Sequence, residues 1–360
     1  MSRSDTGLRV RAAVLGEYAQ PMTVMDLQPA HRDEHTAIVE VLMAGLCHTD
    51  VSLAQGRIRR RVPLVLGHEL VGRRIDAPGA EGSASGRVVV TPYPPGHLVA
   101  RRAPRSGRAS DIQVLPTLAT AAGDPVHAFA QVGAFADHIV IDERRLVPID
   151  DDVPDQVAAM IGCAATTGVN AVYDTAAVPA GATVVVLGLG GVGTVVLMAC
   201  CARGARVVGV DPSAAKRDLA CSLGAVAAFH PDHAELADAL DECLGAPIDY
   251  VFEVVGTPRT QQQAVDLTRP GGCAVLVGSP PEDATVTFNA SSLVGNERVI
   301  RGHANLGQDP ASAVQRVADL YRAGMLPLDR IPFTIVGLAG INDAVAALDD
   351  GALVKVLVRP

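Results

Sequence analysis

The sequence lacks several features that mark other classes of protein. Its seven cysteines include no C-x-x-C pair, and the first 16 residues contain no apolar core followed by small residues, so no secretory signal is expected. The formal net charge of −9 gives no support to a nucleic acid or a membrane as a partner. We therefore expect a cytoplasmic protein whose cysteines are reduced.

The length and the composition indicate a globular protein of two domains. A chain of 360 residues is too long for one ordinary hydrophobic core, and a hydrophobic content of 49% with 19% charged residues is typical of globular proteins. No charge occurs between Gly181 and Ala202, but four glycines in that stretch argue against a membrane span.

Residues 183–210 form the most informative stretch of the chain. Two β-branched runs, 183–187 and 206–210, flank a glycine-rich sequence and a longer apolar run, which together predict strand, glycine turn, helix and strand. The glycine-rich sequence GLGGVG supplies Gly188, Gly190, Gly191 and Gly193. In such a turn, the first glycine permits the tight bend, the second lets the backbone approach a pyrophosphate, and the last lets the helix pack on the strand.

An acidic residue ends the second of these runs. Asp211 follows Gly193 by 18 residues, where a ribose 2′-hydroxyl requires a carboxylate partner and a 2′-phosphate would be repelled. The sequence therefore favours NAD over NADP, although Lys216 and Arg217 leave the second cofactor open.

The remaining patterns separate the chain into two kinds of structure. From residue 212 to about 300, apolar strand patterns alternate with amphipathic helical patterns, which predicts an α/β fold with a doubly wound parallel sheet of the Rossmann type. Residues 8–90 instead alternate short β-branched runs with Gly and Pro, which predicts small β-strands rather than long helices.

Three short segments carry metal-binding chemistry beside glycines. They are GLCHTD at 45–50, LGHE at 66–69 and IGCAATTG at 161–168. Cys47, His68 and Cys163 supply two thiolates and one imidazole, a set that leaves the fourth position of a catalytic zinc open. Glu69 adds a spare carboxylate. We interpret the other five cysteines as core residues.

With these segments, GLGGVG, VGVD and the C-terminal DGALVKVLV, the chain resembles the zinc-dependent medium-chain alcohol dehydrogenases over nearly its whole length. The resemblance implies a GroES-like, mainly β catalytic domain at 1–164 and 304–360, and a Rossmann domain at 165–303. It implies an NAD-dependent alcohol dehydrogenase, a homo-oligomer that transfers hydride between a small-molecule alcohol or aldehyde and NAD(H).

The resemblance also assigns roles around the metal. Cys47, His68 and Cys163 are the implied zinc ligands, and Glu69 is a carboxylate that can approach the metal. Asp50 is the implied partner that orients the His68 ring.

The implied proton path begins at Thr49, whose hydroxyl takes the alcohol proton. Many relatives continue it with a histidine three residues later, where this chain has Ser52, which passes a proton but does not titrate near pH 6.5. We therefore expect proton release by another route.

For the cofactor, the resemblance places His48 and Lys355 at the pyrophosphate, and Thr167 and Val192 beside the nicotinamide ring. Lysine offers a point charge where the family has the bidentate fork of arginine.

For the substrate, the resemblance makes Phe135, and with less support Phe129, candidates for an aromatic wall. Packing in the core is the alternative for both.

The segment from Val90 to Ala130 departs from the family. Many relatives hold a structural zinc there with four cysteines, and this chain has none, so a single catalytic zinc is expected. An alternative is a formaldehyde-type dehydrogenase acting on a thiol adduct, whose carboxylates the arginines of this segment would have to hold, although such a run is more often a solvated loop. These arginines are Arg101, Arg102, Arg105 and Arg108. A zinc-free enoyl or quinone reductase and a non-enzymatic nucleotide-binding protein agree less well with the three metal ligands.

The metal content tests this interpretation. We expect about one zinc per chain in the purified protein, because one Cys2His set is complete and the structural-zinc cysteines are missing. Elemental analysis measures it. A value near zero would favour the zinc-free alternatives, and about two would contradict the interpretation of residues 90–130.

Overall fold

The computed structural model describes residues 7–30, 34–76, 86–93, 117–304, 309–351 and 353–360. The chain divides into two compact units. Unit 1 comprises residues 1–163, 306–318 and 332–360, and unit 2 comprises residues 164–305 and 319–331. The expected domain limits differ from these by a few residues at most, except that 319–331 belongs to unit 2.

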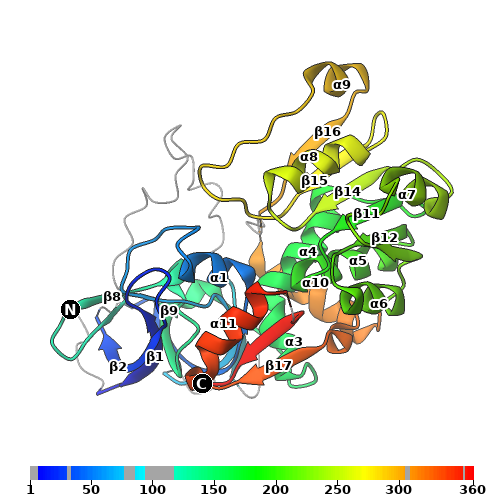
Figure 1. Cartoon of the computed structure of the whole chain (residues 1–360). Helices are drawn as coiled ribbons and strands as arrows, with labels where there is room; N and C mark the ends of the chain where they lie inside the picture. Colours follow the sequence, from blue (N-terminus) through cyan, green and yellow to red (C-terminus); the bar gives the residue numbers. More distant parts are fainter. Residues whose placement is uncertain (1–6, 31–33, 77–85, 94–116, 305–308, 352) are drawn as a thin grey trace. The chain divides into compact units, whose positions relative to one another are not determined.

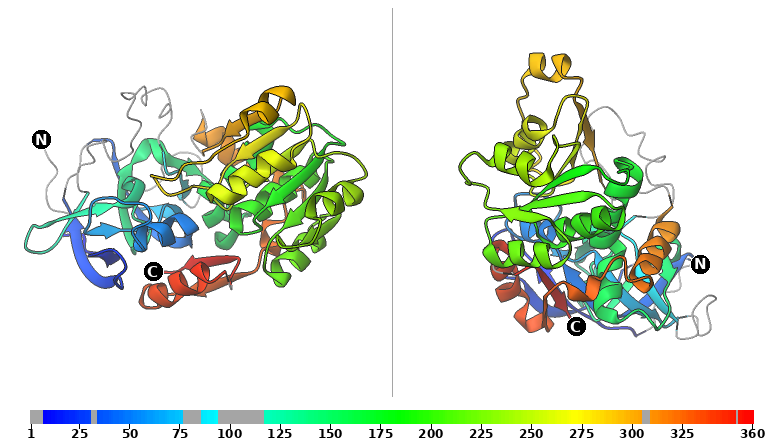
Figure 2. Two further views of the ribbon diagram at one scale, coloured as in Figure 1. Left: turned by 45° about the horizontal axis from the view of Figure 1, so that its top comes forward. Right: turned by 90° about the vertical axis from the view of Figure 1, so that its right-hand side faces the viewer.

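Unit 2 contains the expected parallel α/β sheet. Six parallel strands lie in the order β13-β12-β11-β14-β15-β16, with helices on either side (Figures 1 and 2). The strands are β11 (Thr183–Leu187), β12 (Arg206–Val210), β13 (Ala227–Phe229), β14 (Tyr250–Glu253), β15 (Cys273–Leu276) and β16 (Val299–Gly302). The helices are α4 (Thr166–Asn170), α5 (Gly191–Ala202), α6 (Ala214–Ser222), α7 (Leu236–Leu244), α8 (Pro258–Leu267) and α9 (Ala290–Gly295), with 3₁₀ turn η6 (Leu328–Arg330) and π-helical turn η5 (Ala171–Thr175).

The glycine turn between β11 and α5 has the conformation that the sequence predicts. Gly188 has a φ of +94°, which a residue with a Cβ rarely adopts. A Cβ on Gly193 would lie 1.8 Å from the carbonyl oxygen of Gly188, so only glycine permits this approach of helix to turn.

Unit 1 combines a small closed barrel with an open sheet. The barrel contains β1 (Val10–Leu15), β2 (Thr23–Pro29), β7 (Leu118–Ala119), β8 (Pro125–Ala128) and β4 (Leu64–Val65). The sheet has the order β10-β6-β5-β3-β18-β17, with β9 also paired to β3. Its strands are β3 (Thr36–Leu46), β5 (Glu69–Arg74), β6 (Arg87–Val90), β9 (His138–Asp142), β10 (Leu146–Pro148), β17 (Phe333–Val336) and β18 (Lys355–Val358).

Short helical elements connect these strands. They are α1 (His48–Ala54), α3 (Asp155–Met160), α11 (Ile341–Asp349), the 3₁₀ turns η2 (Phe129–Gln131), η3 (Glu143–Arg145) and η7 (Leu338–Gly340), and the π-helical turn η4 (Ile161–Ala165). A further helix, α10 (Pro310–Arg322), runs from the residues of unit 1 into those of unit 2. The C-terminal patterns thus return to unit 1, as expected, where β18 pairs with β3.

The helix α1 was not expected, since residues 8–90 favoured strands. Asp50, at its third position, accepts a hydrogen bond from the backbone N–H of Cys47 at 3.0 Å, which caps the first turn. Seven residues are too few for a helical period to stand out from the sequence.

The pairing of three strands determines where the predicted metal ligands lie. Glu69 pairs with Gly45 across β5 and β3, and Val356 pairs with Leu46 across β18 and β3. The residues just beyond these pairs, Cys47, His68 and Lys355, are therefore brought to the same end of the sheet.

No helix in the described ranges combines the length and the apolar character that a membrane crossing requires.

Buried Arg87 stabilises unit 1 away from this end of the sheet. Its guanidinium donates to the carbonyl oxygens of Asp150 at 2.8 Å and Val153 at 2.9 Å, and to Asp155 Oδ1 at 2.6 Å. These bonds connect β6 to the segment that leads into α3.

We expect Arg87→Met to lower the free energy of unfolding by about 2–4 kcal/mol, because the carbonyl groups lose their donors. Thermal denaturation measures this. The control is Arg73→Met, which removes an exposed arginine 3.9 Å from Glu40, and should change stability by less than about 0.5 kcal/mol. Equal effects of the two substitutions would contradict the assignment.

Candidate metal centre and nucleotide site

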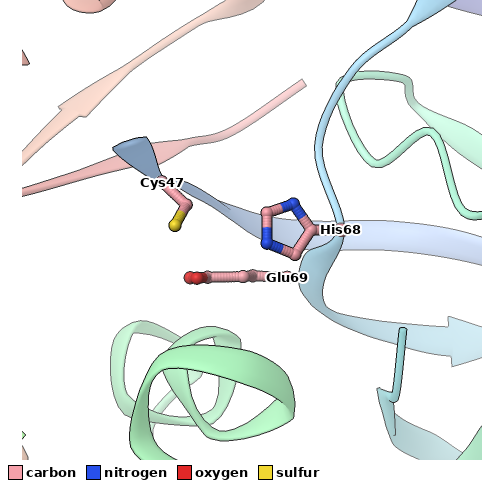
Figure 3. A group of neighbouring side chains, drawn as sticks. All are labelled: Cys47, His68 and Glu69. Atoms are coloured by element: carbon pink, nitrogen blue, oxygen red, sulfur yellow. The ribbon is translucent and has the colours of Figure 1, made fainter. Parts of the chain in front are cut away.

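Three side chains of unit 1 converge at one point. One ligand atom each of Cys47, His68 and Glu69 lies within 4.8 Å of the other two, and the side chains point toward a common space (Figure 3). Cys47 follows β3, His68 precedes β5, and Glu69 begins it. The antiparallel pairing of β3 with β5 brings these positions together.

Asp50 holds the two ligand loops in place. Its Oδ2 accepts from the Cys47 N–H at 3.0 Å, and its Oδ1 accepts from the Gly67 N–H at 2.9 Å. The same Oδ1 lies 3.4 Å from His68 Nδ1. The sequence prediction for Asp50 requires such a contact between the carboxylate and the ring.

Cys163, the third predicted ligand, lies close enough to His68, Glu69 and Cys47 for these groups to act on its thiol. It is not among the three residues whose ligand atoms all lie within 4.8 Å of one another. Burial lowers the pKa of His68, but Asp50 and Cys163 raise it more, so its net pKa lies well above the ordinary value. Burial raises the pKa of the Cys163 thiol. A bound cation favours the thiolate instead.

Gly162 explains how the segment bearing Cys163 comes so near to the strand β6. A Cβ on this residue would lie 2.4 Å from the carbonyl oxygen of Val90, at the end of β6. The close contact of helix and strand requires glycine at this position.

Glu69 forms a buried ion pair with Lys355. Both side chains are almost completely buried, and Lys355 Nζ contacts Glu69 Oε2. Burial lowers the pKa of Lys355, but Glu69 and Cys47 raise it more, and the net shift is upward. The structure thus places Lys355 beside the metal ligands, where its ammonium already has a partner. A contact of Lys355 with the cofactor stays a prediction.

The second carboxylate oxygen of Glu69 supports a metal at this point. Glu69 Oε1 is buried and has no hydrogen-bond partner. The residue Glu69 belongs to the cluster with Cys47 and His68. Leaving a buried carboxylate oxygen unpaired is unfavourable, and a divalent cation would pair with it. Two thiolates and one imidazole are the ligands that zinc prefers.

The predicted proton-transfer residues lie on α1. Thr49 Oγ1 is 3.8 Å from Cys47 Sγ, and the half-buried Ser52 follows three residues later. His48, the first residue of the helix, is exposed. The structure brings Thr49 to the metal cluster and leaves the roles of Ser52 and His48 as predictions.

The two phenylalanines lie in different environments. The Phe129 ring is half-buried and packs edge-on against His68, with ring centroids 5.2 Å apart. Phe135 is fully buried, and its ring would lie 2.8 Å from a Cβ on Gly67. Phe129, the candidate with less support from the sequence, is the one beside a metal ligand, whereas Phe135 packs behind the loop that bears His68.

In unit 2 the predicted nucleotide-binding residues surround the glycine turn. A Cβ on Gly190 would meet no atom of the chain within 4 Å, which leaves space for a ligand at the start of α5. Asp211 Oδ2 accepts from the Leu189 N–H at 2.8 Å, and Oδ1 accepts from the Ser213 N–H at 2.9 Å. Asp211 therefore joins the glycine turn to the end of β12.

Other predicted cofactor residues lie on three helices of unit 2, α4, α5 and α6. Gly191 and Val192 begin α5, and Lys216 is buried in α6. Thr167 is buried in α4, which packs against α5 so closely that a Cβ on Gly168 would lie 2.6 Å from Val195. Their contacts with a cofactor stay predictions.

The sequence indicated glycines beside the predicted ligands, and Gly45 is one of them, since the absence of a Cβ there leaves room for Glu69 and Lys355. The sequence did not indicate Arg145. Arg145 is buried near Phe129, although the sequence DERRL is typical of an exposed loop. The arginines at 101, 102, 105 and 108 lie outside the described residues.

Models of two known protein families match this chain, one mainly in unit 1 and the other mainly in unit 2. Residues 33–151 match the family described as "Alcohol dehydrogenase GroES-like domain", and residues 191–320 match "Zinc-binding dehydrogenase". A geraniol dehydrogenase of Castellaniella defragrans is 30% identical over 375 aligned positions, which cover 99% of each protein.

Solved structures show the same similarity. An alcohol dehydrogenase zinc-binding domain protein from Burkholderia ambifaria has a TM-score of 0.86 at 28% identity. The benzyl alcohol dehydrogenase of Acinetobacter calcoaceticus has a TM-score of 0.86 at 23% identity. Each comparison covers 98% of this chain and 99% of the other.

The close approach of Glu69 and Lys355 to Gly45 generates a prediction. A Cβ at this position would lie 2.3 Å from Glu69 Oε2 and 3.0 Å from Lys355 Nζ. We expect Gly45→Ala to displace the buried pair, to lower the zinc content to less than about half, and to destabilise the fold by about 1–3 kcal/mol. Elemental analysis and thermal denaturation measure the two effects.

Gly16→Ala is the matched control, since a Cβ on Gly16 meets nothing within 4 Å. A Gly45→Ala protein that retains its zinc and its melting temperature would show that the pair tolerates displacement.

Proposed function

Because this chain belongs to the zinc-dependent medium-chain alcohol dehydrogenases, we propose that it oxidises an allylic or benzylic primary alcohol to the aldehyde, with NAD as the hydride acceptor. Two observations support this substrate class. The geraniol dehydrogenase named above acts, by its name, on an allylic alcohol. The Phe129 ring, half-exposed against His68, offers an aromatic surface beside a metal ligand, which suits a planar unsaturated substrate.

Cys47, His68 and Cys163 would hold one zinc ion. When bound there, zinc supplies a Lewis acid that lowers the pKa of an alcohol hydroxyl. The observation that carries the proposal is the cluster of Cys47, His68 and Glu69, together with the unpartnered oxygen of Glu69. We propose a single zinc per chain, because the segment that holds a second zinc in many relatives contains no cysteine here.

Four other side chains around the cluster have proposed roles. Thr49 would accept the proton of the substrate hydroxyl on its side-chain oxygen, which lies 3.8 Å from Cys47 Sγ, and release its own hydroxyl proton toward solvent. Asp50 keeps His68 in one orientation, and Lys355 holds one oxygen of Glu69 while the other has no hydrogen-bond partner. Phe129 excludes water from one side of His68.

We propose that unit 2 binds NAD rather than NADP. Gly190 leaves room for the pyrophosphate at the start of α5, where backbone N–H groups favour an anion. The Asp211 carboxylate, held by the N–H groups of Leu189 and Ser213, would accept the ribose hydroxyls and repel a 2′-phosphate. His48 is proposed to contact the pyrophosphate, and Thr167 and Val192 the nicotinamide ring.

We also propose that the protein is a homo-oligomer. The strand β16 stands at the end of the sheet order and pairs only with β15 among the described strands. Exposed Val299 on this strand and Val294 in the preceding helix offer an apolar surface for a second copy.

The activity is tested with benzyl alcohol, geraniol and ethanol, each with NAD and with NADP, by following the reduced nicotinamide. We expect kcat/KM for the two unsaturated alcohols to exceed that for ethanol by about tenfold or more. We expect NAD to be preferred over NADP by at least about tenfold, because Asp211 repels the phosphate.

The matched variants are Cys163→Ala, which should remove both zinc and activity, and Cys221→Ala, an exposed cysteine whose loss should change neither. Oxidation of formaldehyde with a thiol, without activity on free alcohols, would overturn the proposed substrate class.

Ser52 leads to a prediction about pH dependence. Serine does not titrate between pH 5 and 8, so we expect no inflection from residue 52 in the profile of kcat/KM. Ser52→His should add an inflection near pH 6.5, with activity lost below it as the imidazole becomes protonated. An inflection in the wild type that disappears in Ser52→Ala would contradict the prediction.

A further inference from the structure

The turn that bears Phe129 has an unusual backbone. Ala130 has a φ of +51° and Gln131 a φ of +57°, and both residues carry a Cβ. Such left-handed conformations are unfavourable for residues other than glycine and persist only where the surroundings hold them. The turn follows β8 directly and begins with Phe129.

Buried Arg145 holds both of these residues. Its Nη1 donates to the carbonyl oxygen of Ala130 at 2.5 Å, and its Nη2 donates to Gln131 Oε1 at 2.9 Å. The residue is 4% exposed. Burial lowers the pKa of Arg145 to about 10, so the guanidinium remains charged at neutral pH.

Arg145 is itself fixed by its neighbours. Its carbonyl oxygen accepts from the N–H of Thr91 at 3.0 Å, and β10, which starts at the next residue, pairs with β6. The guanidinium therefore extends from the end of η3, next to the paired strand β10, to the turn that follows β8. A bidentate fork is suited to hold two acceptors at once.

The turn determines where the Phe129 ring lies. The carbonyl oxygen of Phe129 accepts from the N–H groups of Val132 at 2.8 Å and Gly133 at 3.3 Å, which closes the turn. The ring stands perpendicular to that of His68 at a centroid distance of 5.2 Å. A change in φ at residue 130 or 131 would move this ring relative to the metal ligand.

We propose that Arg145 is a positioning residue that sets substrate selectivity, because it holds the strained turn at Ala130 and Gln131 and thereby the Phe129 ring against His68. This inference rests on the proposed function. It assigns discrimination between bulky and small alcohols to a residue that need not touch the substrate.

The test compares kcat/KM for benzyl alcohol with that for ethanol in full-length, zinc-loaded protein. We expect Arg145→Met to lower this ratio by about tenfold or more, mainly through a higher KM for benzyl alcohol, while kcat for ethanol changes by less than about threefold. Arg145→Lys should have an intermediate effect, because a lysine can hold only one of the two acceptors well.

Two arginines of unit 1 serve as controls. Arg144→Met removes the neighbouring arginine of η3, which is exposed and paired with Asp142. Arg87→Met removes another buried arginine that binds carbonyl oxygens. Both should keep the wild-type ratio, although Arg87→Met should be less stable.

A rescue experiment separates positioning from general stability. Glycine adopts a positive φ without strain, so adding Ala130→Gly and Gln131→Gly to Arg145→Met should restore most of the ratio. If Arg145→Met does not fold, Gln131→Ala removes one acceptor alone and should shift the ratio in the same direction by about threefold.

The outcomes are distinguishable. A wild type that oxidises none of the alcohols would overturn the proposed function, and this inference with it. An active wild type whose ratio is unchanged in Arg145→Met and in Gln131→Ala, or changed equally in Arg87→Met, would overturn the role of Arg145 alone.

Discussion

The buried carboxylate of Asp50 is the contact on which the metal-binding end of unit 1 depends. It accepts hydrogen bonds from the backbone N–H groups of Cys47 and Gly67, and it faces the ring of His68. A fully buried charge is tolerated only when hydrogen bonds compensate it, and here the donors are the two loops that bear metal ligands. One side chain thus fixes the start of α1, the loop before β5 and the orientation of an imidazole.

The C-terminal strand β18 is also tied to this cluster of side chains, because its Lys355 pairs with Glu69. Asp50, Glu69 and two cysteine side chains place several acidic groups close together, and Lys355 and His68, whose pKa values are both raised by these neighbours, offset part of their charge. A bound metal ion would offset more of it. Binding of metal, pairing of β18 and folding of unit 1 are therefore coupled.

Local signals made unit 2 predictable, and long-range contacts limited the prediction for unit 1. The β-branched runs and GLGGVG gave the bounds of β11 and β12 to the residue, because strand and turn preferences act within a few positions. The three predicted zinc ligands were chosen from residue type and neighbouring glycines, and the structure brings two of them, Cys47 and His68, together with Glu69. The environments of Lys355 and Arg145 were not, because burial and the pairing of β18 with β3 decide them. Likewise, nothing in the sequence separates Phe129, beside His68, from Phe135 in the core.

The place of β18 in the sheet of unit 1 has a consequence for biosynthesis. This strand lies between β3 and β17, and its Lys355 is separated from Glu69 by 286 positions in the sequence. A chain emerging from the ribosome completes every strand of unit 2 before it can supply this neighbour to β3. Until then the nascent sheet has an open edge at β3, and the carboxylate of Glu69 has no ammonium beside it. The nucleotide-binding unit can therefore form during translation, whereas the catalytic unit waits for residues 355–358.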